Sequence, residues 1–395
     1  MSWRRLRCQR SERVGPTTEA AQTLQGVRHG RRRDRLGGGS GMMPIIRPVL
    51  NWIDERLRIH AIIRATLTEY LVPANLTLWH TLGFVLVTCF VIQVVTGMLL
   101  LVYYVPDTGR AFDTVKFITN KVPYGWLIRD LHAMTSHVFV LAIFLHMAST
   151  LWMRAYRTPR ELQWITGMIL LGLVLVAGLS GYLLPWSQLS YWATTVATNA
   201  AGSIPRIGHT LVLWIRGTPN VSQYTLGRFF AMHVSIIPFS ILAVIGMHLL
   251  FLRLTGIAVP GGEDKATVRK VPFFPHMVTK ELASVFGTLI LVNLLIFYFP
   301  QVNFPEDALI PANPLETPAH IKPHWYFLAN YQFLKIVPNE FLGIILQVIV
   351  GVVLFFLPFL DRGKKSSRLY DGVFYTVVTL AILGYIGLMV WGYYS

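Results

Sequence analysis

The chain has 395 residues, of which 53% are hydrophobic and only 14% charged. A chain this apolar must place much of its surface in lipid, which excludes soluble, collagen-like, disordered and disulfide-rich secreted proteins. The net charge of +16 does not indicate nucleic-acid binding, because the basic residues are divided among loops between apolar segments, as positive-inside topology requires.

The N-terminal part differs from the rest of the chain. Residues 1–42 are rich in arginine and hold no apolar span. They predict a disordered basic tail, or a start codon assigned too early with Met42 or Met43 as the true one; a transit peptide is the alternative. Residues 45–67 alternate apolar and charged positions, which predicts that segment 43–75 is an amphipathic helix on the membrane surface and a lead-in to the first span.

Seven later stretches hold about 20 apolar residues each, enough to cross a bilayer as a helix. They predict an all-α membrane protein with a four-helix domain over 76–260 and a three-helix domain over 261–395. The more basic loops, the N-terminal segment among them, are expected to face the cytoplasm. The predicted spans are Trp79–Val105, Leu127–Trp152, Trp164–Pro185, Leu226–Leu254, Leu282–Pro300, Phe341–Leu360 and Val373–Tyr394.

Histidines recur at helical spacing in the second and fourth spans. His132 and His146 are fourteen residues apart, and His233 and His248 are fifteen apart. At about 100° and 1.5 Å per residue, each pair lies on one face of its helix, with about 21 Å between its members. The two spans run in the same direction, so His132 is level with His233, and His146 with His248. Facing imidazoles are the axial ligands of bis-histidine haem, and two layers predict two stacked haems.

Glycines in the first and third spans repeat this spacing. Gly83 and Gly97 are fourteen residues apart, as are Gly167 and Gly181. Glycine lets a backbone approach a ring closely. One glycine pair alone is equally explained by helix packing, and one histidine pair by core histidines with satisfied hydrogen bonds. The four coincident pairs favour the two-haem interpretation.

Three arginines near the span ends are candidates for the haem propionates. Arg129, Arg228 and Arg253 lie within five residues of a candidate ligand. Each can instead be an interfacial arginine that extends toward the headgroups. His137 lies off the face shared by His132 and His146 and is expected to pack or to form a hydrogen bond.

Five motifs identify a family resemblance that covers about residues 45–394. The motifs are Gly-Trp-Leu-Ile-Arg (125–129), Pro-Arg-Glu-Leu (159–162), Gly-Tyr-Leu-Leu-Pro-Trp (181–186), Thr-Leu-Gly-Arg-Phe-Phe (225–230) and Pro-His-Trp-Tyr (323–326). With these motifs the chain resembles cytochrome b, the haem-carrying subunit of complexes that oxidise quinol together with a Rieske iron–sulfur protein.

The resemblance implies quinol oxidation on the outer side, transmembrane electron transfer through two non-covalent haems b, and quinone reduction on the inner side, coupled to proton translocation. His132 and His233 would hold the outer haem iron, and His146 and His248 the inner one.

The resemblance also implies the quinone sites and the partners. Pro323, His324, Trp325 and Tyr326 would form the quinol site. Lys280 and Glu281 match a basic–acidic pair near the inner quinone site; a solvated helix start explains them equally well. The partners would be a Rieske protein, a c-type cytochrome or similar acceptor, and a second copy of the complex, in a bacterial cytoplasmic membrane.

The sequence departs from the family in three respects. His324 stands where the family has a glutamate that accepts a quinol proton; a histidine can also accept one, or the proton leaves by another route. Seven spans, with fourteen residues between His233 and His248, resemble a fusion of the two chloroplast-type chains. Thr81 stands where chloroplast-type chains attach an extra haem through cysteine, and Cys89 matches a non-ligand cysteine, so a covalent third haem is not expected.

Two other functions remain open from the sequence. The chain could be a di-haem membrane anchor of a dehydrogenase, against which the Pro323–Tyr326 motif and the seven-span length argue. A transporter without a cofactor would leave the fourteen-residue spacing unexplained.

Overall fold

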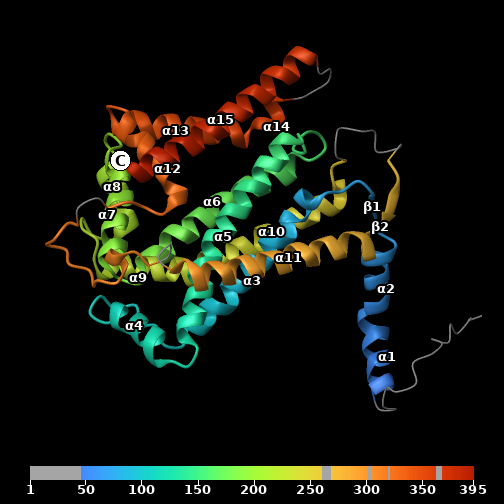
Figure 1. The fold of residues 1–395 in the computed structure, drawn as a ribbon, viewed down its shortest axis with the longest axis horizontal. Helices are drawn as coiled ribbons and strands as arrows, with labels where there is room; N and C mark the ends of the chain where they lie inside the picture. The colour runs from blue at the N-terminus through green and yellow to red at the C-terminus, as the bar shows by residue number, and fades with distance from the viewer. Residues whose placement is uncertain (1–45, 260–267, 301–303, 319–320, 362–366) are drawn as a thin grey trace, which may run out of the picture. The chain divides into compact units, whose positions relative to one another are not determined.

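A computed structural model describes residues 46–259, 268–300, 304–318, 321–361 and 367–395. The basic segment 1–42 lies outside the described residues. The chain divides into two compact units, Met1–Ile62 and Ile63–Ser395, and each is described by itself. Figure 1 shows both units as a ribbon.

The expected surface helix of the first unit is interrupted. Helix α1 spans Ile46–Leu57, and α2 spans Ile59–Ile63 and runs over the unit boundary. Arg58 separates them with a φ of 50°, a left-handed conformation that ends a helix. The side chains of Trp52 and Leu57 are exposed, as the amphipathic pattern predicts for a helix that lies on a surface.

Within the described residues, six helices of the second unit are long and apolar enough to cross a membrane. They coincide with six of the seven predicted spans, because about 20 apolar residues can only satisfy their backbone in lipid as a helix. They are η2 and α3 (Leu78–Thr81 and Leu82–Leu101), α5 (Gly125–Trp152), α6 (Glu161–Leu183), α9, η3 and α10 (Gln223–Ala231, Met232–Ile236 and Ile237–Thr255), α11 (Phe273–Tyr298) and α15 (Arg368–Tyr394).

The predicted span Phe341–Leu360 is shorter and broken. Helix α13 covers Glu340–Phe355, and the four-residue α14 (Leu357–Leu360) follows after Phe356. Asn339 caps α13 by accepting a hydrogen bond from the Leu342 amide at 3.1 Å, as N-cap side chains commonly do. At 16 residues, α13 alone falls short of spanning length, so the seven-span count stays a prediction.

Each helix that carries candidate histidine ligands packs along a helix that carries two of the spaced glycines. Helix α3 packs along α5, α6 packs along α10, and α5 contacts α6. In the main core, Met134 and Val138 of α5 meet Val85 of α3 and Ile241 of α10. In the C-terminal part, α11 packs on α5 and α3, while α12 (Trp325–Ile336) packs on α15 and α13 (Figure 1). The core therefore lies between the helices that carry the candidate ligands.

The long connections carry secondary structure that the sequence analysis did not predict. The loop after α6 forms two helices, and Trp186 just before the first of them and Tyr191 within it are buried. A two-stranded antiparallel sheet places Val72 opposite Val271, so that the lead-in to α3 is joined to the start of α11. The elements are η1 (Arg64–Thr68), β1 (Leu71–Pro73), α4 (Ala111–Lys121), α7 (Gln188–Gly202), α8 (Gly208–Arg216), β2 (Lys270–Pro272) and η6 (Glu306–Ala308).

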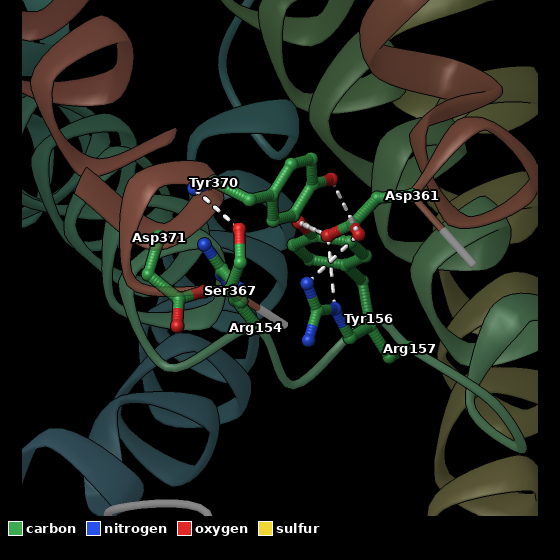
Figure 2. A network of polar contacts seen from close by, with 7 residues as sticks. All are labelled: Arg154, Tyr156, Arg157, Asp361, Ser367, Tyr370 and Asp371. Atoms are coloured by element: carbon green, nitrogen blue, oxygen red, sulfur yellow. Dashed lines mark hydrogen bonds and ion pairs between the residues drawn. The ribbon is translucent and has the colours of Figure 1, made fainter. Parts of the chain in front are cut away.

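A polar network ties the loop after α5 to the C-terminal part (Figure 2). The buried Asp361 carboxylate accepts two hydrogen bonds from Arg157, at 2.8 and 2.9 Å, one from Tyr156 at 2.6 Å and one from Tyr370 at 2.9 Å. Burial acts to raise the pKa of Asp361, but these hydrogen bonds outweigh it and hold the pKa below its usual value. Beside them, Arg154 pairs with Asp371 at 2.6 Å. The network holds together two parts of the second unit that are some 200 residues apart in the sequence.

Candidate functional site: four histidines and a connected cavity

The first histidine pair, His132 of α5 and His233 at the α9–α10 junction, faces across the core. The ring centroids are 6.2 Å apart with the planes at 78°. A metal–nitrogen bond of about 2 Å on each side, with about 1 Å from each nitrogen to its ring centre, requires about 6 Å. A Cβ at Gly97 would lie 3.2 Å from Cε1 of His132, and one at Gly181 would overlap the His233 ring. The lack of a side chain at Gly97 and Gly181 therefore leaves the space that the two imidazoles occupy.

The second histidine pair, His146 of α5 and His248 of α10, meets glycines in the same way. A Cβ at Gly167 would lie 3.3 Å from Cε1 of His248, and one at Gly83 would lie 3.9 Å from Cε1 of His146. All four glycines that the spacing singled out thus contact the four histidines that the spacing singled out. The contact is tight at three of them and ordinary at Gly83.

Hydrogen bonds fix the tautomer of two of these rings. Nδ1 of His132 lies 2.9 Å from Oγ1 of Thr96, and Nδ1 of His248 lies 2.9 Å from Oγ1 of Thr166. Each threonine hydroxyl already donates its proton to a carbonyl of its own helix. Each hydroxyl can therefore only accept from the imidazole, so Nδ1 carries the proton and Nε2 keeps a free lone pair.

His233 has the same tautomer, and His146 has no such partner. Nδ1 of His233 lies 3.0 Å from the Ala177 carbonyl, which can only accept. Ser180 lies 3.3 Å from the same nitrogen. Nδ1 of His146 is buried and has no hydrogen-bond partner among the residues that the structure describes. Three of the four rings therefore keep Nε2 unprotonated, with a lone pair that could bind a metal.

The threonine and serine partners were missed in the sequence, although a signal was present. Thr96, Thr166 and Ser180 each stand directly before one of the spaced glycines. Leu82 stands before the fourth, Gly83, and this is the glycine that faces the histidine without an Nδ1 partner. A hydroxyl before the glycine thus marks the rings whose tautomer is fixed.

The wider spacing of His233 and His248 has a structural cause. Residues Met232–Ile236 form a π-turn between α9 and α10. A π-turn closes i→i+5 hydrogen bonds and takes up one residue more than an α-turn. The fifteen-residue separation therefore does not rotate His248 off the shared face by the angle that a regular helix would give.

These residues fit bis-histidine haem better than a metal held by protein ligands alone. Over the described ranges, no group of three or more His, Cys, Asp or Glu side chains could hold a metal ion. Structural zinc needs four such ligands, whereas haem needs two axial donors because the macrocycle supplies the rest. Free Nε2 lone pairs in facing rings and side-chain-free glycine backbones meet that requirement.

A cavity of about 340 Å³ joins the first histidine pair to the segment 323–326. Besides that pair, the side chains that line it include those of Arg129, His137, Tyr182, His324 and Tyr326. Trp325 and Pro323 of the same segment are not among them. One apolar space therefore serves both a candidate metal centre and a candidate substrate site.

His324 lies within a cluster of aromatic rings at the start of α12. Its centroid is 4.0 Å from that of Tyr182, 4.8 Å from that of His137 and 5.4 Å from that of Tyr326. Burial, and secondly the neighbouring His137, lowers the pKa of His324 to about 3. Its ring is therefore neutral at rest. In the sequence, Tyr182 is recognised only as part of the motif 181–186, and nothing there predicts its contact with His324.

His137 forms the hydrogen bond that the sequence analysis expected. The indole Nε1–H of Trp325 donates to Nδ1 of His137 at 3.0 Å. His137 is buried, and its ring meets His324 edge to face at 86°. The bond therefore joins α5 to the 323–326 segment.

The three candidate propionate arginines have different surroundings. Arg129 lines the cavity, donates to Thr119 at 3.0 Å and lies 4.1 Å over the Phe304 ring. Arg228 is exposed and donates to two carbonyls at the end of α8. Arg253 is exposed and stacks 3.7 Å over Tyr70. Only Arg129 borders the cavity lined by a histidine pair.

The other predicted residues lie near the start of α3. Lys280 Nζ donates to the Leu76 carbonyl at 2.6 Å, and Glu281 follows it in α11, partly buried. Thr81 is buried, donates to the Leu78 carbonyl and lies 2.7 Å from Ser284 Oγ. Cys89 lies in the main core, fully buried. The Thr81 hydroxyl thus serves helix packing.

Two family models match the chain. Cytochrome b/b6/petB matches residues 67–256, and cytochrome b(C-terminal)/b6/petD matches residues 311–395. Cytochrome b of Rickettsia prowazekii is 39% identical over 345 residues, 86% of each protein. "Cytochrome b/c1" of Bradyrhizobium diazoefficiens is 38% identical over 358 residues, 89% of this chain. The chain spans about half of that relative, 52%.

A solved structure agrees with these relatives. A chain of "Hyperthermophilic respiratory Complex III" superposes with a TM-score of 0.81 at 36% identity, over 87% of this chain and 91% of that one. The helices, the paired histidines and the two matching models lead to one assignment: this chain belongs to the cytochrome b family, with the N- and C-terminal family domains in a single polypeptide.

Proposed function

We propose that this chain is the haem-carrying subunit of a quinol–cytochrome c-type oxidoreductase, and that its two histidine pairs hold two non-covalent haems b. The observation that carries the proposal is the cavity shared by His132, His233, His324 and Tyr326. A di-haem anchor has no need of a second set of polar side chains beside a haem site.

The chain's own residues supply binding, orientation and a proton acceptor. When bound, the haems supply one-electron carriers between the two halves of the apolar core. Thr96, Thr166 and Ala177 accept the Nδ1 proton of three imidazoles and so leave Nε2 of each ring available to a haem iron. Arg129 is the arginine best placed for a propionate, because it alone of the three candidates borders the cavity.

Quinol enters the cavity beside Tyr326 and gives a hydroxyl proton to His324. The O–H bond breaks and an N–H bond forms on the neutral ring, while the electron leaves to a Rieske iron–sulfur partner. His324 thereby takes the role that the family assigns to glutamate. Its lowered pKa of about 3 makes it a weak base at rest, so the transfer must accompany loss of the electron, which acidifies the quinol oxygen.

Quinone reduction is proposed on the opposite side, near Lys280 and Glu281. The assembly contains a Rieske protein and a c-type cytochrome and is a dimer, in a bacterial cytoplasmic membrane with the N-terminus inside. No covalent third haem is proposed, because a threonine stands at position 81.

The test is haem content and quinol oxidation in the purified complex. We expect two b haems per chain by pyridine haemochrome, two steps in a redox titration, and no haem on the chain after denaturation. His324→Ala should lower quinol oxidation at least tenfold, whereas His209→Ala, on the exposed face of α8, should not. Colourless protein would refute the proposal, and native activity in His324→Ala would refute the role of His324.

A further inference from the structure

Two histidines meet in the cavity wall, and only one of them can take a proton without losing a hydrogen bond. Indole Nε1–H is a donor only. The 3.0 Å bond from Trp325 to Nδ1 of His137 therefore requires an unprotonated Nδ1, and places the ring proton on Nε2. A second proton on His137 would have to sit on Nδ1, facing the indole N–H. No comparable donor to the ring of His324 is found among the described residues.

We propose that Trp325 and His137 act as a positioning pair that keeps His137 neutral, so that the quinol proton goes to His324. The inference rests on the proposed function of His324 as the proton acceptor. It assigns a role to a histidine inside a span that the haem layers do not use; ionisable groups at such depth are usually functional.

Electrostatics makes the choice between the two rings consequential. The centroids of His137 and His324 are 4.8 Å apart, and two cations at that distance in a buried site repel strongly. A cation on His137 would therefore prevent His324 from accepting a proton. Without the indole donor, Nδ1 of His137 can hold a proton, so the two rings can compete for the quinol proton.

The ionisable side chains whose rings face His324 are phenols. Tyr182 of α6 and Tyr326 of α12 face His324, and both are neutral phenols when protonated. Asp307 of η6 interacts electrostatically with Tyr182. Among the described residues, no carboxylate forms an ion pair with His324.

The first test is the pH profile of quinol oxidation in the native complex and in four variants. Trp325→Phe keeps the aromatic body and removes the donor. We expect the acid limb of kcat/KM to move up by about one pH unit, the equivalent of one hydrogen bond. Trp214→Phe, in an 81% exposed tryptophan, is the matched control and should keep the native limb.

The decisive form is the double variant. His137→Gln cannot be protonated but can still accept from the indole, so its acid limb should stay at the native position even if kcat falls. In Trp325→Phe/His137→Gln the shift caused by Trp325→Phe should disappear. An unshifted Trp325→Phe profile, or a shift that persists in the double variant, would overturn the proposal. Haem content of two per chain shows that each variant is folded.

A second measurement does not depend on activity. In complex labelled with ¹⁵N-histidine, the signal that His137→Gln removes should report an unprotonated Nδ1 from pH 8 down to pH 5. In Trp325→Phe the same signal should report a protonated Nδ1 at a higher pH than in the native complex. A native His137 that titrates between pH 8 and pH 5 would refute the inference, whereas absent quinol oxidation with the expected ¹⁵N result would refute only the proposed function.

Discussion

Replacing Gly181 by alanine tests whether the glycine spacing serves the candidate haem site. A Cβ at this position would overlap the imidazole of His233. Alanine by itself favours the helix by about 1 kcal/mol over glycine. Overpacking of a fixed ring costs about 1–3 kcal/mol. The cost falls mainly on the state in which both imidazoles are held in ligating positions, and a net loss of about 1.4 kcal/mol weakens haem retention about tenfold.

The other glycines give the expected order of effects. Gly97→Ala and Gly167→Ala should be intermediate, since their Cβ atoms would lie 3.2 and 3.3 Å from an imidazole carbon, and Gly83→Ala should be mildest at 3.9 Å. Gly172→Ala, in the same helix as Gly181, is the control because nothing lies within 4 Å of its Cβ position.

The assay is pyridine haemochrome per chain together with a two-step redox titration. Gly181→Ala should lose or shift the haem of the first histidine pair and leave the other step in place. If Gly181→Ala kept the haem content and both potentials of Gly172→Ala, the assignment of the glycines to the haem site would be wrong.

Three further perturbations follow from other contacts. Asp361→Asn should lower the free energy of unfolding by about 1–3 kcal/mol at pH 7. This difference between variant and native chain should vanish as the pH falls through the lowered pKa of Asp361. A carboxylate with a depressed pKa stabilises the fold only while it is ionised. Thr96→Val should raise the midpoint potential of one haem in a redox titration. Without the Thr96 hydroxyl as acceptor for its Nδ1 proton, the His132 imidazole becomes less basic and donates less to the iron. Gly178→Ala should raise KM for quinol more than it lowers haem content, because its Cβ would lie 2.9 Å from the Tyr326 hydroxyl in the cavity.

Matched variants separate these effects from general damage. Asp113→Asn alters an exposed carboxylate of α4 that forms no ion pair within the described residues, and it should leave the thermal midpoint unchanged within error. Thr88→Val alters a hydroxyl of α3 that bonds only its own helix at Phe84 and should leave both potentials in place. An effect of Thr88→Val equal to that of Thr96→Val would contradict the imidazole argument.

The sequence by itself determined the spans and the layer spacing, because both depend on local backbone geometry. About 20 apolar residues must be helical in lipid, and 3.6 residues per turn bring residues fourteen apart to one face. These rules placed six helices with ends that agree to within five residues, except that α11 begins nine residues before the predicted span. They also brought Gly97 to His132 and Gly181 to His233. The five family motifs then indicated the resemblance to cytochrome b.

Only the tertiary structure decided which groups the histidines contact, because those partners come from other helices. The bond from Trp325 to His137 joins residues 188 positions apart, and no periodicity predicts it. The π-turn at Met232–Ile236 and the break of α13 at Phe356 also escape a regular-helix calculation, since each is a local departure that packing stabilises. Helix periodicity therefore placed the histidines in layers, and side-chain packing between helices set their protonation.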